Sequence, residues 1–382
     1  MPYQFDEKEL TNLKEVLDSG NLAAHDGGFV GRLERAFARR IGAKHGVAAN
    51  SAMSLLHAAI NAAGAGAGDE VICDPIVQFG AVASMYNNAY PVFADVEPKT
   101  FLIDPESVRA RITRHTKAIV CTNLWGVPCE LDRLREIADE HGLVLIEDCA
   151  HALFAQFKEK HCGTWGHVGV FSFNQGKHLP TGDGGMAVTD DEALMGKMRA
   201  MLIFGESPSE LAWNYRMTEL AAAVGLAQLE KVVGYIAGYN ENKRILDALV
   251  DECAWLARRE IPEDRTLSGY MYGMLFRGDQ HGIDYDDFKK VVEETGANVG
   301  FGFTKMPAYQ YRFFQVPLAY GNKGCPLRCV YYKGNFEYRN GLCPVAEDLI
   351  PRIVSVRLMA TREEVQRNAE LLHEAIRKVE KG

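Results

Sequence analysis

The chain has 382 residues, of which 47% are hydrophobic and 24% charged, so it has a globular composition and more length than one ordinary domain needs. Its formal net charge is −9 and its basic residues are dispersed, which excludes a nucleic-acid binder and favours a small-molecule partner. No stretch approaches ~18 uninterrupted apolar residues, and the polar N-terminus differs from a secretory signal. Nine cysteines, an odd number, fit reduced thiols. We therefore expect a cytoplasmic protein without a membrane span.

Short apolar strands alternate with helices over the first two-thirds of the chain. Strands are expected over residues 46–50, 70–73, 91–95, 117–122, 143–148, 168–173 and 185–189. Helices are expected between them, over residues 51–63, 79–88 and 131–141. Apolar runs spaced by helices in this way predict a parallel or mostly parallel sheet that is covered on both faces.

A long helical region, from Met217 to about Val250, follows this alternation. The remainder mixes expected strands and helices, at 270–277, 353–358, 285–295 and 362–378. We place a domain boundary near residue 245. This gives a large domain over residues 1–245, which includes an N-terminal helical segment, and a smaller C-terminal α+β domain over residues 246–382.

Lys177 lies between the apolar strand that ends near Phe173 and a turn that is dense in glycine. A lysine amine can hold an aldehyde cofactor when it is fixed on a short, well-supported loop, although a surface lysine in a loop is the ordinary alternative. Ligands of parallel sheets bind beyond the carboxyl ends of the strands. Asp148, which ends the strand over residues 143–148, therefore lies where chemistry is expected.

Five separated motifs agree in order and spacing with one known family. They are Ser51-Ala52-Met53-Ser54, Glu147-Asp148-Cys149-Ala150-His151, Ser172 five residues before Lys177, Gly182-Asp183-Gly184-Gly185 and Asn214-Tyr215-Arg216-Met217-Thr218-Glu219. Together they resemble the DegT/StrS family of pyridoxal-phosphate-dependent sugar aminotransferases, a branch of the fold-type I aminotransferases. The resemblance implies pyridoxal 5′-phosphate as cofactor. It also implies an α/β fold with a mostly parallel seven-stranded sheet, flanked by helices, in the large domain.

The resemblance assigns roles around the cofactor ring. Lys177 would form the Schiff base and carry the proton, and Asp148 would pair with the protonated pyridine nitrogen. Phe79 matches the aromatic residue that stacks on the pyridine face, with a core phenylalanine as the alternative. His151 matches the position beside the phenolic oxygen, with a hydrogen-bonded structural histidine as the alternative. His178, directly after the lysine, is expected to be a loop residue near the cofactor or the partner chain and not a catalytic residue.

The phosphate would lie at the start of the helix over residues 51–63, because a helix N-terminus offers free N–H groups. Ala52, Met53 and Ser54 open this helix, and Ser172 would contribute its hydroxyl. Met53 departs from the family, in which a threonine hydroxyl helps to hold the phosphate. In family members the segment that carries Asn214 and Arg216 reaches toward the partner's phosphate, which implies a homodimer.

The activity implied is a ping-pong transfer of an amino group from L-glutamate or L-glutamine to a keto sugar. A nucleotide-linked keto-deoxysugar is the expected acceptor, and a cyclitol ketone (an inosose) is the alternative. A sugar dehydratase of the same family would carry histidine in place of Lys177, so the transferase is favoured. A cofactor-binding regulator without catalysis remains a further alternative, and Met53 favours it slightly.

Two features of the C-terminal part stay open. Cys325, Cys329 and Cys343 could hold zinc but lack a nearby histidine, so we expect loop thiols and no metal. Residues 306–347 are dense in aromatic side chains, which could line a sugar pocket or pack in the core. These side chains are Tyr309, Tyr311, Phe313, Phe314, Tyr320, Tyr331, Tyr332, Phe336 and Tyr338.

Overall fold

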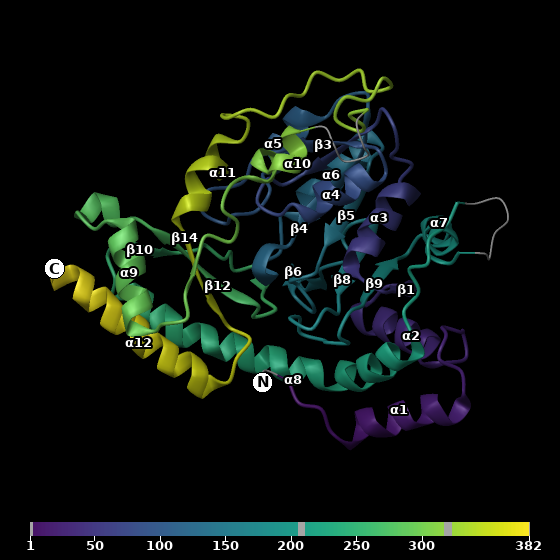
Figure 1. Cartoon of the computed structure of the whole chain (residues 1–382), viewed down its shortest axis with the longest axis horizontal. Helices are drawn as coiled ribbons and strands as arrows, with labels where there is room; N and C mark the ends of the chain where they lie inside the picture. Colours follow the sequence, from purple (N-terminus) through teal and green to yellow (C-terminus); the bar gives the residue numbers. More distant parts are fainter. Residues whose placement is uncertain (1–2, 205–210, 317–322, 382) are drawn as a thin grey trace.

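The structure, a computed structural model, describes residues 3–204, 211–316 and 323–381 (Figure 1). Its large sheet has seven strands in the order β1-β9-β8-β5-β4-β2-β3. The strands are β1 (His45–Ala49), β2 (Glu70–Cys73), β3 (Tyr90–Phe93), β4 (Thr116–Thr122), β5 (Val144–Asp148), β8 (Val168–Ser172) and β9 (Gly185–Thr189). Only β9 runs antiparallel to its neighbours. The predicted mostly parallel seven-stranded sheet is therefore confirmed.

Both faces of this sheet are covered. Every residue of β2, β3 and β9 is buried, and successive side chains of a strand point to opposite faces. The helices of this part are α2 (Phe29–Ile41), α3 (Ala52–Ala62), α4 (Phe79–Tyr86), α5 (Pro105–Arg111), α6 (Leu131–His141) and α7 (Glu192–Leu202). The predicted helices over residues 51–63, 79–88 and 131–141 correspond to α3, α4 and α6.

A second sheet is antiparallel, with the order β10-β12-β14-β13. Its strands are β10 (Leu256–Arg258), β12 (Met271–Phe276), β13 (Gly300–Phe301) and β14 (Ile353–Arg357). Buried side chains of α9 (Tyr285–Thr295), α12 (Arg362–Lys381) and the end of α8 (Glu219–Asp251) form a separate hydrophobic core with this sheet. The strands and helices expected here are present. A small third sheet joins β6 (Gln156–Phe157), β7 (Lys160–His161) and β11 (Arg265–Thr266).

The long helix α8 connects the two cores. Ala223 and Val232 lie in the core of the large sheet, whereas Leu246 and Val250 lie in the second core. Figure 1 shows α8 running along the molecule, with α1 (Glu7–Ser19) and α12 beside it. Residue 245 lies inside α8, which is continuous from Glu219 to Asp251, so no break in the chain marks a boundary at this residue. The predicted domain boundary near residue 245 stays a prediction.

By length and composition, α8 is also the one helix of the described chain that could cross a membrane. Within its most apolar window, 44% of the residues are buried inside the protein, and α8 packs against α1, α2 and α12. Core helices that join two parts of a protein have the same length and composition, and we assign α8 to that class.

The aromatic segment packs against the β2–β3 edge of the large sheet. The Tyr332 ring stacks on Tyr90 with centroids 4.1 Å apart, and its hydroxyl donates to Glu70 at 2.9 Å. Tyr338 also stacks on Tyr90, and its hydroxyl donates to the Pro91 carbonyl at 2.5 Å. These side chains cover the edge strand β3, as sheet edges require. Tyr332 and Tyr338 therefore pack against the large sheet, which is one of the two interpretations of the aromatic segment. Tyr320, another aromatic residue of this segment, lies outside the described residues.

Shorter elements complete the chain. They are α10 (Arg312–Gln315), α11 (Pro344–Leu349) and the 3-10 helices η1 (Leu124–Gly126), η2 (Gly278–His281), η3 (Ala308–Gln310) and η4 (Ile350–Arg352). Cys343 is buried against the carbonyl of Phe93, and Cys325 is half-buried. In the described ranges, no three or more His, Cys, Asp and Glu side chains are grouped to hold a metal ion.

Candidate active site

The sequence-predicted site residues meet at the edge of the sheet where the parallel strands end. Asp148, the last residue of β5, pairs with Thr122 of β4. Gly185, the first residue of β9, pairs with Ser172 of β8 on one side and with Ala49 of β1 on the other. Since α3 begins shortly after β1, its first turn lies at the same edge. The sheet thus brings four of the five motifs together.

Lys177 is held on a tightly bonded loop. Its N–H donates to the Asn174 carbonyl at 2.9 Å, and the Gln175 N–H donates to the Gly182 carbonyl at 2.7 Å across the loop. Gly182 has a φ of +90°, a left-handed conformation that favours glycine. The half-buried side chain donates from Nζ to the Tyr270 hydroxyl at 3.3 Å. The loop therefore gives Lys177 the fixed support that a covalent attachment needs.

Two buried carboxyl groups, Asp148 and Asp74, interact at the carboxyl ends of the strands. Asp148 is 1% exposed and accepts from the Ala150 N–H at 3.0 Å. Burial raises the pKa of Asp148, and the charge of Lys177 opposes this shift. Asp74, just after β2, accepts from the N–H groups of Ile76 and Val77 and from the Thr122 hydroxyl. Burial, with the charge of Asp148, raises the pKa of Asp74 to about 6. A buried carboxylate at Asp148, which the charge of Lys177 stabilises, can balance a positive ring nitrogen.

His151 lies flat against Tyr270. The two rings are 4.3 Å apart at an angle of 16°, and His151 Nδ1 accepts from the Trp125 N–H at 3.4 Å. Burial, with the charge of Lys177, lowers the pKa of His151 well below its usual range, so the imidazole is neutral. A neutral ring that accepts at Nδ1 carries its proton on Nε2 and is a donor there.

Tyr270, like Asp74, is a site residue that the sequence analysis did not predict. Tyr270 lies directly before β12 and meets Lys177 from 93 residues away along the chain. The sequence analysis expected a strand over residues 270–277 and so placed Tyr270 at the beginning of a strand. No pattern in the sequence paired that strand end with the lysine loop.

The first turn of α3 is open to an anion. The Ser51 hydroxyl caps the helix by accepting from the Ser54 N–H at 3.1 Å, and the Ser54 hydroxyl donates to Asn50 at 2.6 Å. In the described chain the N–H groups of Ala52 and Met53 have no acceptor. A Cβ on residue 185 would lie 2.9 Å from the Ala52 nitrogen. The glycine at this position therefore leaves the space next to the Ala52 nitrogen open. The Ser172 hydroxyl, which accepts from the Asn174 N–H at 3.3 Å, is at the same edge.

The remaining sequence-predicted residues differ in exposure. The Phe79 ring, at the start of α4, is 40% exposed, which is unusual for a core phenylalanine. Asn214 and Arg216 are exposed and bonded to each other at 3.0 Å. An isolated bridge between Arg216 and Ala49 fixes this segment beside the start of α3. His178 is buried, with Nε2 3.0 Å from the Ser268 carbonyl, and burial lowers its pKa to about 3. It is a packing residue beside the lysine.

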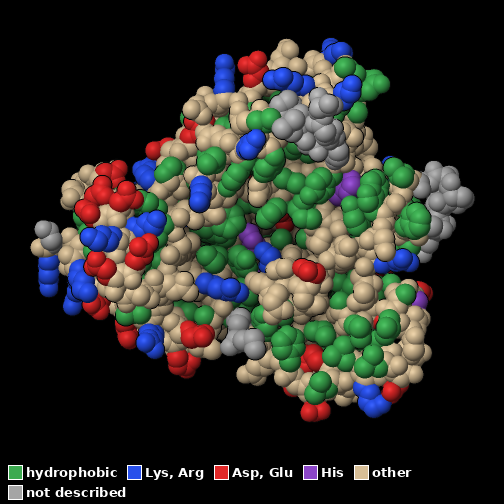
Figure 2. All heavy atoms as spheres, viewed as in Figure 1, with side chains coloured by type: hydrophobic (Ala, Val, Ile, Leu, Met, Phe, Trp, Pro, Cys, Tyr) green, Lys and Arg blue, Asp and Glu red, His purple; other side chains and the backbone are tan. Residues whose placement is uncertain are grey.

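Together these residues fit pyridoxal 5′-phosphate. Lys177 supplies an amine for the aldehyde, Asp148 a buried carboxylate for the ring nitrogen, and the start of α3 free N–H groups for the phosphate. Figure 2 shows hydrophobic side chains gathered at the centre of one face, around basic, acidic and histidine side chains. Apolar walls with a few convergent polar groups are typical of a small-molecule site.

Comparisons with known proteins agree with this geometry. Residues 3–328 match the DegT/DnrJ/EryC1/StrS aminotransferase family. The spore coat polysaccharide biosynthesis protein SpsC of Bacillus subtilis (strain 168) is 31% identical over 346 residues, 85% of this chain and 87% of that protein. The L-glutamine:2-deoxy-scyllo-inosose aminotransferase of Streptomyces kanamyceticus is 36% identical over 323 residues, 78% of this chain and 74% of that protein.

Solved structures share the whole fold. The crystal structure of DesI in the presence of its TDP-sugar product superposes with a TM-score of 0.85 at 27% sequence identity. The match covers 100% of this chain and 93% of the DesI chain. The resemblance seen in the five motifs thus extends over the chain. The chain belongs to the DegT/DnrJ/EryC1/StrS family and is a pyridoxal-phosphate-dependent aminotransferase.

Proposed function

We propose that this aminotransferase moves an amino group from L-glutamate or L-glutamine to a keto sugar, by a ping-pong mechanism, and that the sugar is a nucleotide-linked keto-deoxysugar. The observation that carries this proposal is the placement of Lys177, on a fixed loop between Tyr270 and the buried Asp148. The structural likeness to DesI, which was crystallised with a TDP-sugar product, supports the acceptor class. The likeness to the inosose aminotransferase supports a cyclitol ketone as the second candidate.

When bound, pyridoxal 5′-phosphate supplies the electron sink that makes the donor's α-proton acidic. Lys177 would hold the cofactor through its Nζ before the donor enters. Once released, the same amine would take the α-proton and return it on the cofactor side, as general base and then general acid. The hydrogen-bonded loop would hold the backbone of Lys177 in one place during both proton movements.

The groups around Lys177 would set the charge balance of this transfer. Asp148 would keep the ring nitrogen protonated, since its carboxylate is buried and has a single described N–H donor, that of Ala150. The neutral His151 would donate from Nε2 to the phenolic oxygen, while Tyr270 holds its ring in place. Phe79, with an exposed ring, would cover the pyridine face.

The phosphate would bind at the start of α3. Ala52 and Met53 would donate their N–H groups, Ser54 would close the first turn, and Ser172 would donate its hydroxyl. The methionine at position 53 removes one hydroxyl contact but leaves its N–H in place. The N–H groups of Ala52 and Met53 would therefore remain as phosphate donors.

We also propose a homodimer in which Asn214 and Arg216 of the partner subunit complete the phosphate site. Both side chains are exposed at the edge of the site, which suits residues that serve a second chain. All nine cysteines lie in the described residues and are free thiols, which supports the cytoplasm as the location.

A panel of ketones tests the acceptor. The holoenzyme is incubated with glutamate or glutamine and with nucleotide-linked 3- and 4-keto-deoxysugars or inososes, and amine formation is measured. The proposal expects amination of a nucleotide-linked sugar, and amination of inososes alone would establish the second candidate. A bound chromophore that responds to no amino donor would instead indicate a regulator.

A further inference from the structure

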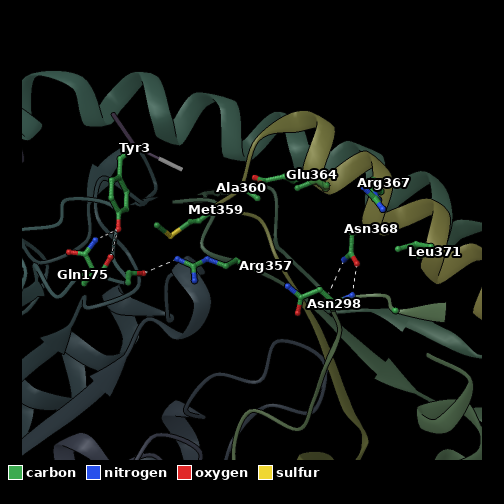
Figure 3. A pocket seen from close by; sticks show the side chains of 13 residues that line it. Tyr3, Gln175, Asn298, Arg357, Met359, Ala360, Glu364, Arg367, Asn368 and Leu371 are labelled. Carbon is green, nitrogen blue, oxygen red and sulfur yellow. Dashed lines mark hydrogen bonds between the residues drawn. The ribbon is translucent and has the colours of Figure 1, made fainter. Parts of the chain in front are cut away.

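Two arginines at the antiparallel sheet come close to the candidate active site, and they differ in burial. Arg357, at the end of β14, is exposed, lines an open cavity of about 720 Å³ and donates to the Gly176 carbonyl at 3.4 Å (Figure 3). Arg259, directly after β10, is 5% exposed and forms no ion pair with a described carboxylate. Its charge nevertheless reaches the site, because it is one of the charges that lower the pKa of His151.

Arg259 is held by backbone oxygens and aromatic rings in place of a carboxylate. Its Nε donates to the Thr100 carbonyl, and its Nη1 donates to the Leu124 carbonyl at 2.7 Å. The guanidinium lies 5.3 Å from the centre of the Phe101 ring and 5.9 Å from that of the Trp125 ring, and Nη2 has no acceptor in the described chain. Burial lowers the pKa of Arg259 to about 9, so the group is charged at neutral pH. A buried cation without a counter-ion costs stability, which indicates a role in function.

One peptide group, between Leu124 and Trp125, links this arginine to His151. The carbonyl of the group accepts from Arg259 and from the Val127 N–H, and its own N–H, that of Trp125, donates to His151 Nδ1 at 3.4 Å. Because a trans peptide is planar, its C=O and N–H point in opposite directions, so a donor that fixes the oxygen also fixes the direction of the N–H. A charged donor on the oxygen also polarises the group and makes its N–H a stronger donor.

The turn that carries this peptide group needs support from outside. Trp125 has a φ of +59° and a ψ of 23°, the left-handed region that is unfavourable for a bulky side chain. At the other end of the turn, the Ser268 N–H donates to the Gly126 carbonyl at 3.3 Å. A Cβ on residue 273 of β12 would lie 2.8 Å from the Trp125 ring and 3.3 Å from Arg259 Cδ, so the glycine there leaves room for both. Residues of the antiparallel sheet and its approach therefore hold both ends of the turn.

We propose that Arg259 is a positioning residue of the active site, which acts through the Leu124–Trp125 peptide group to keep the proton of His151 on Nε2. The inference rests on the proposed function, in which this Nε2–H donates to the phenolic oxygen of the cofactor. The charged and titratable groups that face His151 are Lys177, His178, Tyr270 and Arg259. Of these, Arg259 is the one that binds the peptide group whose N–H reaches Nδ1.

Nitrogen NMR of the cofactor-free protein, labelled isotopically at histidine, tests this assignment without any measurement of activity. The variant His151→Gln identifies the signals of His151. In the parent protein Nε2 should carry the proton and Nδ1 should not, and a proton on Nδ1 would overturn the assignment. Arg259→Met should lower the ratio of this tautomer to the other about fivefold or more, and should raise the proton affinity of His151.

Arg258→Met is the matched control. This neighbouring arginine is 44% exposed and pairs with Asp247 and Asp251, so its loss should change neither the tautomer nor the proton affinity of His151. Circular dichroism verifies the fold of each variant. If Arg259→Met does not fold, Arg259→Gln, which keeps a donor without the charge, carries the same expectation. An unchanged tautomer ratio in the folded variant would overturn the role of Arg259.

The holoenzyme separates this inference from the proposed function. A weaker donor at the phenolic oxygen should lower the pH midpoint of the cofactor absorbance in Arg259→Met by about half a unit or more, and Arg258→Met should keep the parent's midpoint. A changed tautomer with an unchanged midpoint would overturn the role at the cofactor. A parent enzyme that transaminates, while Arg259→Met keeps the parent's tautomer and midpoint, would refute the inference and leave the function standing. A changed tautomer and midpoint in a protein that transaminates no ketone would support the role of Arg259 while the proposed function failed.

Discussion

Asp74 should make the stability of the cofactor-free protein depend on pH in a direction opposite to that of most carboxylates. Its pKa rises from an ordinary value of 3.8 to about 6 on folding. Such a group contributes stability below pH 3.8 that is lost as the pH rises through 6, because the unfolded chain releases the proton first. At ~1.4 kcal/mol for each tenfold change in proton affinity, the loss is about 3 kcal/mol.

The variant Asp74→Asn removes this titration and keeps an oxygen for the N–H groups of Ile76 and Val77. Relative to the parent protein, its free energy of unfolding should therefore improve by about 3 kcal/mol between pH 4 and pH 7. With an unfolding entropy of ~2.1 cal/mol/K per residue over the chain, this corresponds to about 4 °C in the difference of Tm. Calorimetric scans of both proteins across this pH range measure it.

Asp247→Asn is the control of opposite sign. Burial raises the pKa of Asp247, but the hydrogen bond and charge of Lys243 outweigh burial, so the pKa is lowered. This variant should lose stability relative to the parent as the pH rises from the lowered pKa of Asp247 to the ordinary value of 3.8, and the difference should stay constant above it, so its scans extend below pH 4. A Tm difference for Asp74→Asn that stays constant with pH, while Asp247→Asn shows its expected trend, would refute the account of Asp74.

Three further changes address the ring site. Asp148→Asn should lower single-turnover transamination at least about 100-fold, because a neutral amide cannot hold the ring nitrogen in its charged form, and cofactor absorbance after mixing with donor measures it. Tyr270→Phe removes the acceptor of Lys177 Nζ and should lower kcat/KM about tenfold with a changed pH profile; an unaltered profile would limit Tyr270 to packing against His151. Phe79→Ala should weaken cofactor binding about tenfold in a titration of the cofactor-free protein, and unchanged affinity would return Phe79 to an ordinary surface position.

The alternation of strands and helices was enough to predict the large sheet. Runs such as Val144–Asp148 are apolar throughout because both of their faces are covered, and this signal is local in the sequence. The placement of Asp148, Ser172 and the start of α3 at one edge follows from the parallel order of the strands. These parts of the site could therefore be predicted from short motifs.

The contributions of the small domain could not be predicted in the same way. Tyr270 and Arg357 meet the lysine loop from 93 and 181 residues away, through an antiparallel sheet whose pairing no short motif specifies. The aromatic segment is similar, since the stacking of Tyr332 on Tyr90 depends on a long connection that folds back over β3. Local sequence patterns predicted the strands and helices, but the contacts between distant strands and loops depend on tertiary packing.

Ser54 shows a finer difference. The sequence analysis placed Ser54 at the start of the helix that would hold the phosphate, and its hydroxyl donates to Asn50 instead of pointing free. Hydroxyl groups near a helix start often bond to neighbouring backbone or side chains, and sequence position does not reveal which partner they choose.

The measurement that tests the central claim most directly is borohydride reduction of the holoenzyme and of Lys177→Ala, followed by mass spectrometry of the intact chains. The account predicts that the parent protein gains one covalently attached cofactor at Lys177 and that the variant gains none, while circular dichroism shows the same fold for both. It also predicts that the variant no longer transaminates. Covalent trapping of the cofactor in Lys177→Ala, or attachment at another lysine of the parent protein, would contradict it.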